Sequence, residues 1–88
     1  MDRAINSNQL LILSNVDGKN ITALLTMLSE KFSVPLSTLK LNAKVLKEIG
    51  LISFEKSSGL SSVSLTDLGK FVKEILAKNQ GFKTNSRN

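Results

Sequence analysis

SVPLSTLKLNAKVLKEIGL, residues 33–51, predicts a turn, one helix and a glycine that ends the helix. Pro35 suits the first position of a helix and disfavours helical geometry at the residue before it. Gly50 is of the residue type most often found just after a helix end. We therefore expect a helix from about residue 35 to residue 49.

This helix has an apolar face and a mostly polar face. At about 100° per residue, Leu39, Ala43 and Leu46 share a stripe that should face the core. The opposite side is mostly polar and carries Ser37, Lys40, Leu41, Lys44 and Glu48. A helix in a DNA major groove presents a lysine-bearing face of this kind, and so does an ordinary solvated helix. The helix alone leaves both interpretations open.

Length and composition limit the classes of protein to consider. At 88 residues the chain has the size of one domain, which buries roughly 60–65% of its unfolded surface. The absence of cysteine excludes disulfides and thiolate metal sites. No apolar run approaches the ~20 residues of a membrane span, and the first residues lack the hydrophobic stretch of a signal peptide. We expect a soluble cytoplasmic protein.

The charge balance favours an anionic partner. The formal net charge is +5 and the pI is about 9.8, above the value at which a nucleic-acid partner is suspected. Ten of the twelve basic residues are lysines. Lysine suits phosphate contacts better than the paired hydrogen bonds by which arginine reads guanine. The chain is therefore better equipped to hold a nucleic-acid backbone than to read guanines.

Two helices are expected before residue 33. Ser7 or Asn8 can cap a first helix over residues 9–16, which is apolar on almost every side and should meet both the core and a second subunit. After a turn at residues 17–20, Ile21 suits a one- or two-residue strand and Thr22 can cap a second helix over residues 23–32. Only two residues then separate this helix from Pro35. That link predicts a helix-turn-helix corner, although the usual glycine in the turn is missing.

After Gly50 the hydrophobic pattern changes from the helical period to the alternation of strands. Residues 51–55 and 62–65 are expected to form two strands around a turn-rich tip at 56–61. Thr66 can cap a last helix over residues 67–78, whose apolar stripe is broader than one small domain can cover. The remaining width would suit a partner helix. Residues 79–88 are expected to be a polar tail.

The run VLKEIGLISFEKSSGLSSVSLTDLGKFV, residues 45–72, resembles winged helix-turn-helix transcription regulators, especially those of the MarR and PadR types. The positions that carry the resemblance are Leu46, Glu48, Gly50, Leu51, Ile52, Leu65, Thr66, Asp67 and Gly69. The resemblance covers about residues 9–76. It predicts a mostly α fold with a small β-hairpin wing, in the order α-β-α-α-β-β-α. An N-terminal arm would occupy residues 1–8, the winged domain 9–78 and the tail 79–88.

The resemblance also implies a site and a partner. Residues 35–49 would be the recognition helix in the major groove of double-stranded DNA, and residues 53–64 would be the wing on the backbone or in the minor groove. The implied DNA-binding residues are Ser37, Thr38, Lys40, Leu41, Lys44, Lys56, Ser57 and Ser58. The implied homodimer contacts are Leu10, Leu11, Phe71, Val72, Ile75 and Leu76, with recognition helices about 34–36 Å apart. The resemblance requires no metal, cofactor or small-molecule effector.

Two departures keep an alternative open. Leu41 stands where many relatives carry arginine or another polar reader, with Val45 beside it. Leu41 would contact either a thymine methyl group or a partner protein, and the protein contact is preferred. The wing is poor in charge, with Lys56 next to Glu55. The alternative function is therefore a protein-interaction module or assembly subunit.

Catalysis is not expected. The chain has no histidine and no cysteine, so it lacks the usual general base at neutral pH and the usual thiol nucleophile. The seven carboxylates are spread singly along the chain, and the five glycines form no phosphate-binding loop. Each carboxylate is expected to be a helix cap or a solvated charge.

Overall fold

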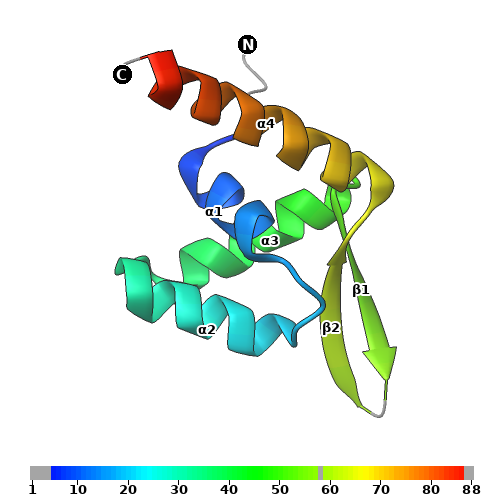
Figure 1. Cartoon of the computed structure of the whole chain (residues 1–88). Coiled ribbons are helices and arrows are strands. Elements are labelled where there is room, and N and C mark those ends of the chain that lie inside the picture. Colours follow the sequence, from blue (N-terminus) through cyan, green and yellow to red (C-terminus); the bar gives the residue numbers. More distant parts are fainter. Residues whose placement is uncertain (1–4, 58, 87–88) are drawn as a thin grey trace.

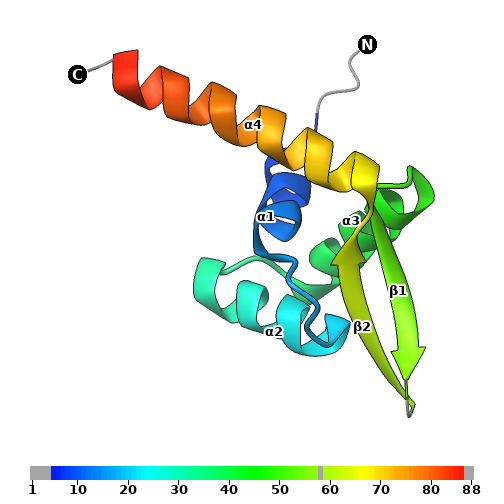
Figure 2. The same cartoon turned by 45° about the vertical axis from the view of Figure 1, so that its right-hand side comes forward.

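The structure is a computed structural model that describes residues 5–57 and 59–86. Its elements are α1 (Ser7–Asn15), α2 (Ile21–Phe32), α3 (Leu36–Glu48), β1 (Ile52–Ser57), β2 (Leu60–Leu65) and α4 (Asp67–Ser86). Helix α4 lies across α1 at one end of the molecule, and the β1–β2 hairpin projects toward the other end, beside α2 (Figures 1 and 2). The predicted fold class, mostly α with one hairpin, is confirmed.

The core lies between the three N-terminal helices and the base of the hairpin. Its fully buried large side chains are Ile12, Leu13, Leu24, Leu28, Leu39, Leu46, Ile52 and Val63. Burying each side chain of this size stabilises the fold by about 1.5–3 kcal/mol relative to leaving it exposed. The stripe predicted on α3 faces this core, because Ala43 is buried together with Leu39 and Leu46.

Asn6 caps α1, so the prediction of Ser7 or Asn8 as cap is wrong. The Gln9 backbone N–H donates to Asn6 Oδ1 over 2.8 Å, and the Asn6 N–H donates to Gln9 Oε1 over 3.2 Å. This reciprocal pair is a capping box, which satisfies two helix N–H groups at once. The helix therefore starts two residues before residue 9, inside the predicted arm.

The same two side chains connect α1 to α3. Asn6 Nδ2 and Gln9 Nε2 donate to Asn42 Oδ1 over 3.2 and 3.1 Å. Asn42 in turn donates from Nδ2 to the Thr38 carbonyl over 2.8 Å and is 9% exposed. A buried amide must find partners, and Asn42 finds them at the start of α1.

The short strand lies one residue earlier than predicted. Asn20, rather than Ile21, makes an isolated antiparallel bridge with Ser62 of β2. Asn20 also caps α2 in place of Thr22, because its Oδ1 accepts from the Ala23 N–H over 3.0 Å. The Asn20 side chain thus caps α2 directly after the bridge.

A serine closes the helix-turn-helix corner where glycine is usual. Ser33 ends α2 in the left-handed region, with φ 57°, and its N–H donates to the Ser29 carbonyl. The Ser29 hydroxyl donates to the Val34 carbonyl over 2.6 Å. Left-handed backbone costs a non-glycine residue about 1–2 kcal/mol, and these hydrogen bonds offset part of that cost. The predicted corner between α2 and α3 is present.

The hairpin strands are longer than predicted. The antiparallel register runs from Ile52↔Leu65 to Ser57↔Leu60, so most of the predicted tip at 56–61 belongs to the strands. Gly59, directly before β2, has φ 80°. Tight hairpin connections require positive φ, which glycine adopts without strain.

A threonine and a glycine connect the start of α4 to the segment between α3 and β1. Thr66 Oγ1 accepts from the Gly69 N–H over 2.9 Å and donates to the Gly50 carbonyl over 2.6 Å. The Thr66 N–H donates to the Leu51 carbonyl over 3.1 Å. A Cβ at Gly69 would lie 1.9 Å from that same carbonyl oxygen. In the Leu-Thr-x-x-Gly pattern, the threonine thus caps α4, and the glycine lets the backbone of α4 approach the backbone of Leu51.

Helix α4 continues to Ser86 instead of ending near Lys78. The prediction of a tail at 79–88 is therefore wrong for most of that segment. The segment contains no proline, and a polar composition without proline does not stop a helix that is already formed. No helix in the described part of the chain is long and apolar enough to cross a membrane.

Candidate nucleic-acid interface

The outer face of α3 is exposed at most of the predicted contact positions. The side chains of Ser37, Lys40, Leu41 and Lys44 are exposed there. Thr38 lies on another flank of the helix, is half-buried, and supplies the carbonyl that holds Asn42. The structure therefore brings four of the five α3 residues to one solvent-facing surface and turns Thr38 toward the α1 side.

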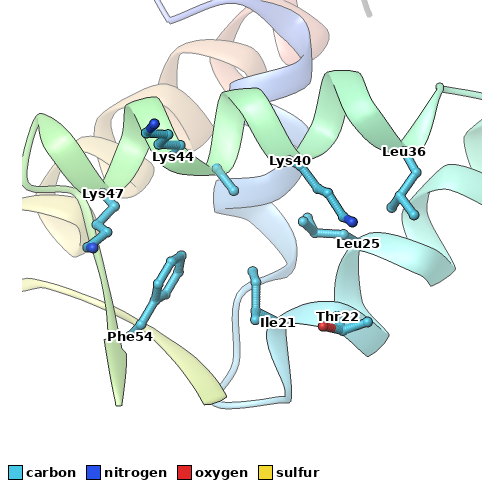
Figure 3. Close-up of a pocket in the computed structure, with 9 residues that line it drawn as sticks. Ile21, Thr22, Leu25, Leu36, Lys40, Lys44, Lys47 and Phe54 are labelled. Atoms are coloured by element: carbon cyan, nitrogen blue, oxygen red, sulfur yellow. The ribbon is translucent and has the colours of Figure 1, made fainter. Parts of the chain in front are cut away.

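Three lysines form a row along α3. Lys40, Lys44 and Lys47 follow one another at intervals of four and three residues, and all are exposed (Figure 3). At 1.5 Å per residue the row is about 10 Å long. Lys47 Nζ lies 5.6 Å from the centroid of the Phe54 ring, within the range of a cation–π contact. Lys47 was not among the predicted contact residues, and the sequence pattern of α3 alone does not assign it to this row.

A pocket opens beside this lysine row, between the start of α2, α3 and β1 (Figure 3). Its volume is about 340 Å³. The residues that line it are Ile21, Thr22, Leu25, Leu36, Lys40, Ala43, Lys44, Lys47 and Phe54. Five of these side chains are apolar, three are lysines and none is a carboxylate. The pocket is thus an apolar hollow with a cationic rim.

The wing adds one lysine on the same side. Phe54 and Lys56 are two residues apart on β1 and therefore share one face of the hairpin, whereas Glu55 points to the other face. Lys56 is exposed. Ser57 is the last residue of β1, and Ser58 lies outside the described residues. Lys56 therefore extends the basic row of α3 on the side of the hairpin that faces the pocket.

The predicted dimer contacts divide into two groups. Phe71 and Ile75 of α4 are 59% and 42% exposed, and Leu68, which was not predicted, is 51% exposed. The other four, Leu10, Leu11, Val72 and Leu76, are half-buried. Of these, Leu11, Val72 and Leu76 pack against the core of their own chain. Leu68, Phe71 and Ile75 form a stripe on α4 that we call the α4 apolar stripe.

Acidic side chains do not neutralise the lysine row within the part of the chain that the structure describes. The ion pair found there joins Lys19 Nζ and Asp17 Oδ2 over 3.7 Å, and both side chains are more than half exposed. Exposed pairs of this kind contribute little to stability. The charges of Lys40, Lys44 and Lys47 thus remain available to an anionic partner.

No protein-family model and no curated protein matches the sequence, but solved structures match the fold. The transcriptional regulator SlyA aligns with a TM-score of 0.76 and 20% identity, over 96% of this chain and 61% of SlyA. The adhesin competence repressor AdcR from Streptococcus pyogenes aligns with a TM-score of 0.77 and 16% identity, over 100% of this chain and 65% of AdcR. F-93 of SSV1 aligns with a TM-score of 0.67 and 16% identity, over 93% of this chain and 99% of F-93.

The chain thus spans under two thirds of the length of SlyA and AdcR. At these identities the likeness concerns the fold. In that fold, α2 and α3 are the helix-turn-helix and the β1–β2 hairpin is the wing. The resemblance noted in the sequence is confirmed at this level: the chain has the winged helix-turn-helix fold of the regulators SlyA and AdcR.

Proposed function

We propose that the protein is a transcriptional regulator that binds double-stranded DNA as a homodimer. Helix α3 enters the major groove, and the wing with Lys56 lies on the backbone or in the minor groove. The observation that carries the proposal is the exposed row of Lys40, Lys44 and Lys47 on the helix that follows the helix-turn-helix corner. The names of SlyA, a transcriptional regulator, and AdcR, a repressor, support it.

The electrostatics suit a duplex. Each chain carries +5, so two chains carry +10 (twice +5). Lysine ammonium groups are compact charges that pair with phosphates and release counterions from the duplex. Such binding weakens steeply as salt rises. Most of the affinity is therefore expected from phosphate contacts.

The α4 apolar stripe supplies the dimer contact in this proposal. Helix α4 lies at the end of the molecule opposite the hairpin tip (Figure 1). Pairing of the α4 apolar stripes around a twofold axis would leave both α3 helices free. A twofold pair binds half-sites one helical turn apart, about 34–36 Å between centres.

Replacing Lys40 and Lys44 together by alanine is expected to weaken binding to duplex DNA at least tenfold at 0.1 M salt. In a homodimer the double variant removes four ammonium groups, so the slope of log K against log[salt] should fall in magnitude by about 4. Fluorescence anisotropy with a labelled random duplex at several salt concentrations measures both quantities.

The matched control is the double variant Lys70→Ala with Lys78→Ala, which removes the same charge from exposed positions on α4. It should change the slope by less than half as much. Equal slopes for the two double variants would mean that binding to the duplex depends only on the net charge of the protein. Helix α3 would then not be the contact surface.

Leu41 offers a test of base contact. It is 63% exposed on the outer face of α3, at the edge of the lysine row, and an apolar side chain there can contact the methyl group of thymine. Once a preferred site has been selected from random duplexes, replacing its thymines by deoxyuridine removes only the methyl groups. We expect affinity to fall about threefold to tenfold for the parent protein and to change little for Leu41→Ala. An unchanged parent affinity would show that Leu41 reads no thymine.

A protein-interaction module is the second candidate, because Leu41 and Ile49 of α3 are 63% and 50% exposed. In that case a duplex would bind weakly and without preference among random sequences. Selection of binding sites from a random duplex pool separates the two candidates, since only a DNA-reading protein enriches a common sequence.

A further inference from the structure

One buried polar contact joins α1 to α3. Asn42 is 9% exposed and, within the described part of the chain, is the one polar residue that is buried. Its Oδ1 accepts from Asn6 Nδ2 over 3.2 Å and from Gln9 Nε2 over 3.1 Å. Its Nδ2 donates to the Thr38 carbonyl over 2.8 Å. We call Asn6, Gln9 and Asn42 the amide cluster.

The amide cluster lies on the opposite side of α3 from the lysine row. At about 100° per residue, Asn42 is about 160° around the helix from both Lys40 and Lys44. Helix α1 packs against α3 on the side of Asn42 (Figures 1 and 2). The amide of Asn42 is therefore not free to contact a duplex bound at the lysines. Any role of Asn42 in DNA binding must be exerted through the position of α3.

We propose that the amide cluster determines how well the protein discriminates between DNA sequences, with Asn42 as a positioning residue for the exposed face of α3. This inference rests on the DNA function proposed above. A rotation of α3 by about 10° moves atoms at the helix surface, about 5–6 Å from the axis, by about 1 Å. Binding surfaces must be held to within about 0.5 Å and 10–20° of the geometry that binds, which requires directional contacts behind them. The two hydrogen bonds from Asn6 and Gln9 are such contacts.

Discrimination and overall affinity depend on the position of α3 in different ways. Lysine side chains are long and flexible, so their ammonium groups reach phosphates from a range of helix orientations. Contacts to base edges have a fixed direction, and they carry the sequence information. Loss of the amide cluster should therefore lower the preference for one sequence and leave phosphate-based affinity nearly unchanged. A contact that only stabilised the fold would lower stability and leave the preference unchanged.

Two variants break this contact from opposite sides. Asn42→Leu removes the amide from α3, keeps a side chain of similar size and introduces a better helix former. The double variant Asn6→Ser with Gln9→Met removes both donors from the side of α1, keeps a side-chain oxygen at the cap position and leaves α3 unchanged. Asn6 is exposed and Gln9 is half-buried, so their amides can turn to water when Asn42 is replaced. Both variants are therefore expected to fold.

The matched control is Asn15→Leu. Asn15 is half-buried on α1, and its Nδ2 donates over 2.8 Å to the Leu11 carbonyl of the same helix. The control thus removes an equal amide from outside the amide cluster. Urea denaturation followed by circular dichroism measures the stability of every variant before the DNA assays.

Fluorescence anisotropy measures the affinity for the duplex selected from a random pool and for a scrambled duplex of the same composition. The ratio of the two dissociation constants should be about 10³ or more for the parent protein. Loss of one base contact typically costs about tenfold, so this ratio should fall at least about tenfold in both cluster variants. The affinity for the scrambled duplex should change less than about twofold, because it comes from phosphate contacts. Asn15→Leu should keep the ratio of the parent.

Combining the three substitutions should lower the ratio no further than either cluster variant does, because each breaks the same contact. An unchanged ratio in either cluster variant would overturn the proposal. A loss confined to Asn42→Leu would come from the side chain on α3 itself and not from its contact with α1. If the parent selects no common sequence, the DNA function is wrong and this inference falls with it. If the parent selects one and the variants keep its ratio, only this inference is wrong.

Discussion

Gly69→Ala is expected to destabilise the protein by about 3 kcal/mol. Alanine is favoured over glycine by about 1 kcal/mol within a helix, so propensity alone predicts a gain in stability. At this position, however, the new Cβ would lie 1.9 Å from the Leu51 carbonyl oxygen, which is backbone and cannot rotate away. Helix α4 must shift, and the hydrogen bonds of Thr66 to Gly50 and Leu51 weaken with it. Forcing extra volume into a close contact typically costs about 1–3 kcal/mol, and the loss of these hydrogen bonds adds to it.

Urea denaturation followed by circular dichroism measures this change. In a domain of this size, a loss of 3 kcal/mol also lowers the melting temperature by more than about 10 °C. Lys70→Ala, the exposed neighbour on the same helix, should change stability by less than about 0.5 kcal/mol. A Gly69→Ala variant as stable as the parent would mean that α4 does not approach Leu51 so closely.

Phe71→Glu is expected to convert a homodimer to monomers and to lower the affinity for DNA at least a hundredfold. Phe71 is 59% exposed in the single chain, so its replacement should hardly affect folding. In the dimer it would place a charge in an apolar contact without a partner. A monomer loses the second half-site, and linked binding of two sites is worth about 10²–10⁴ in affinity.

Sedimentation equilibrium gives the oligomeric state and anisotropy gives the affinity for the duplex. Ala77→Glu is the matched control, because Ala77 is exposed on the same helix but lies about 120° or more around it from the α4 apolar stripe. It adds the same negative charge and should leave both the dimer and DNA binding nearly unchanged. A monomeric parent protein, or a dimer that tolerates Phe71→Glu, would remove the α4 apolar stripe from the interface.

Periodicity and turn residues were enough to predict the architecture. The helix with Leu39, Ala43 and Leu46 on one side has an unambiguous 3.6-residue pattern, and Pro35 and Gly50 mark its limits to within a residue or two. Thr66 was correctly predicted to cap α4, whereas the caps of α1 and α2 were not predictable in the same way. Several Ser, Thr and Asn side chains stand near the starts of α1 and α2, and which one reaches the N3 amide depends on where the preceding segment is held. At α2, the pairing of Asn20 with β2 makes that choice.

The candidate site was predicted only in part. The exposed face of α3 follows from one helix, and Lys40 and Lys44 were placed on it correctly. The pocket needs three elements at once, since its walls come from the start of α2, from α3 and from Phe54 of β1. Lys47 lies near the edge of the core stripe in a helical projection, and its place on the pocket rim follows from the position of Phe54. No single-segment pattern contains that information.

The amide of Asn42 fixes the rotation of α3 about its own axis. A helix held by leucines alone can rotate by several degrees about its own axis at little cost, because apolar contacts are not directional. Hydrogen bonds are directional, and here two donors from the start of α1 converge on one oxygen of α3. Any roll would weaken both hydrogen bonds and leave the buried oxygen of Asn42 without its partners. Helix α3 is therefore held at one rotation about its own axis. Under the proposed function, its side chains would enter a DNA groove in an orientation that the domain fixes before binding.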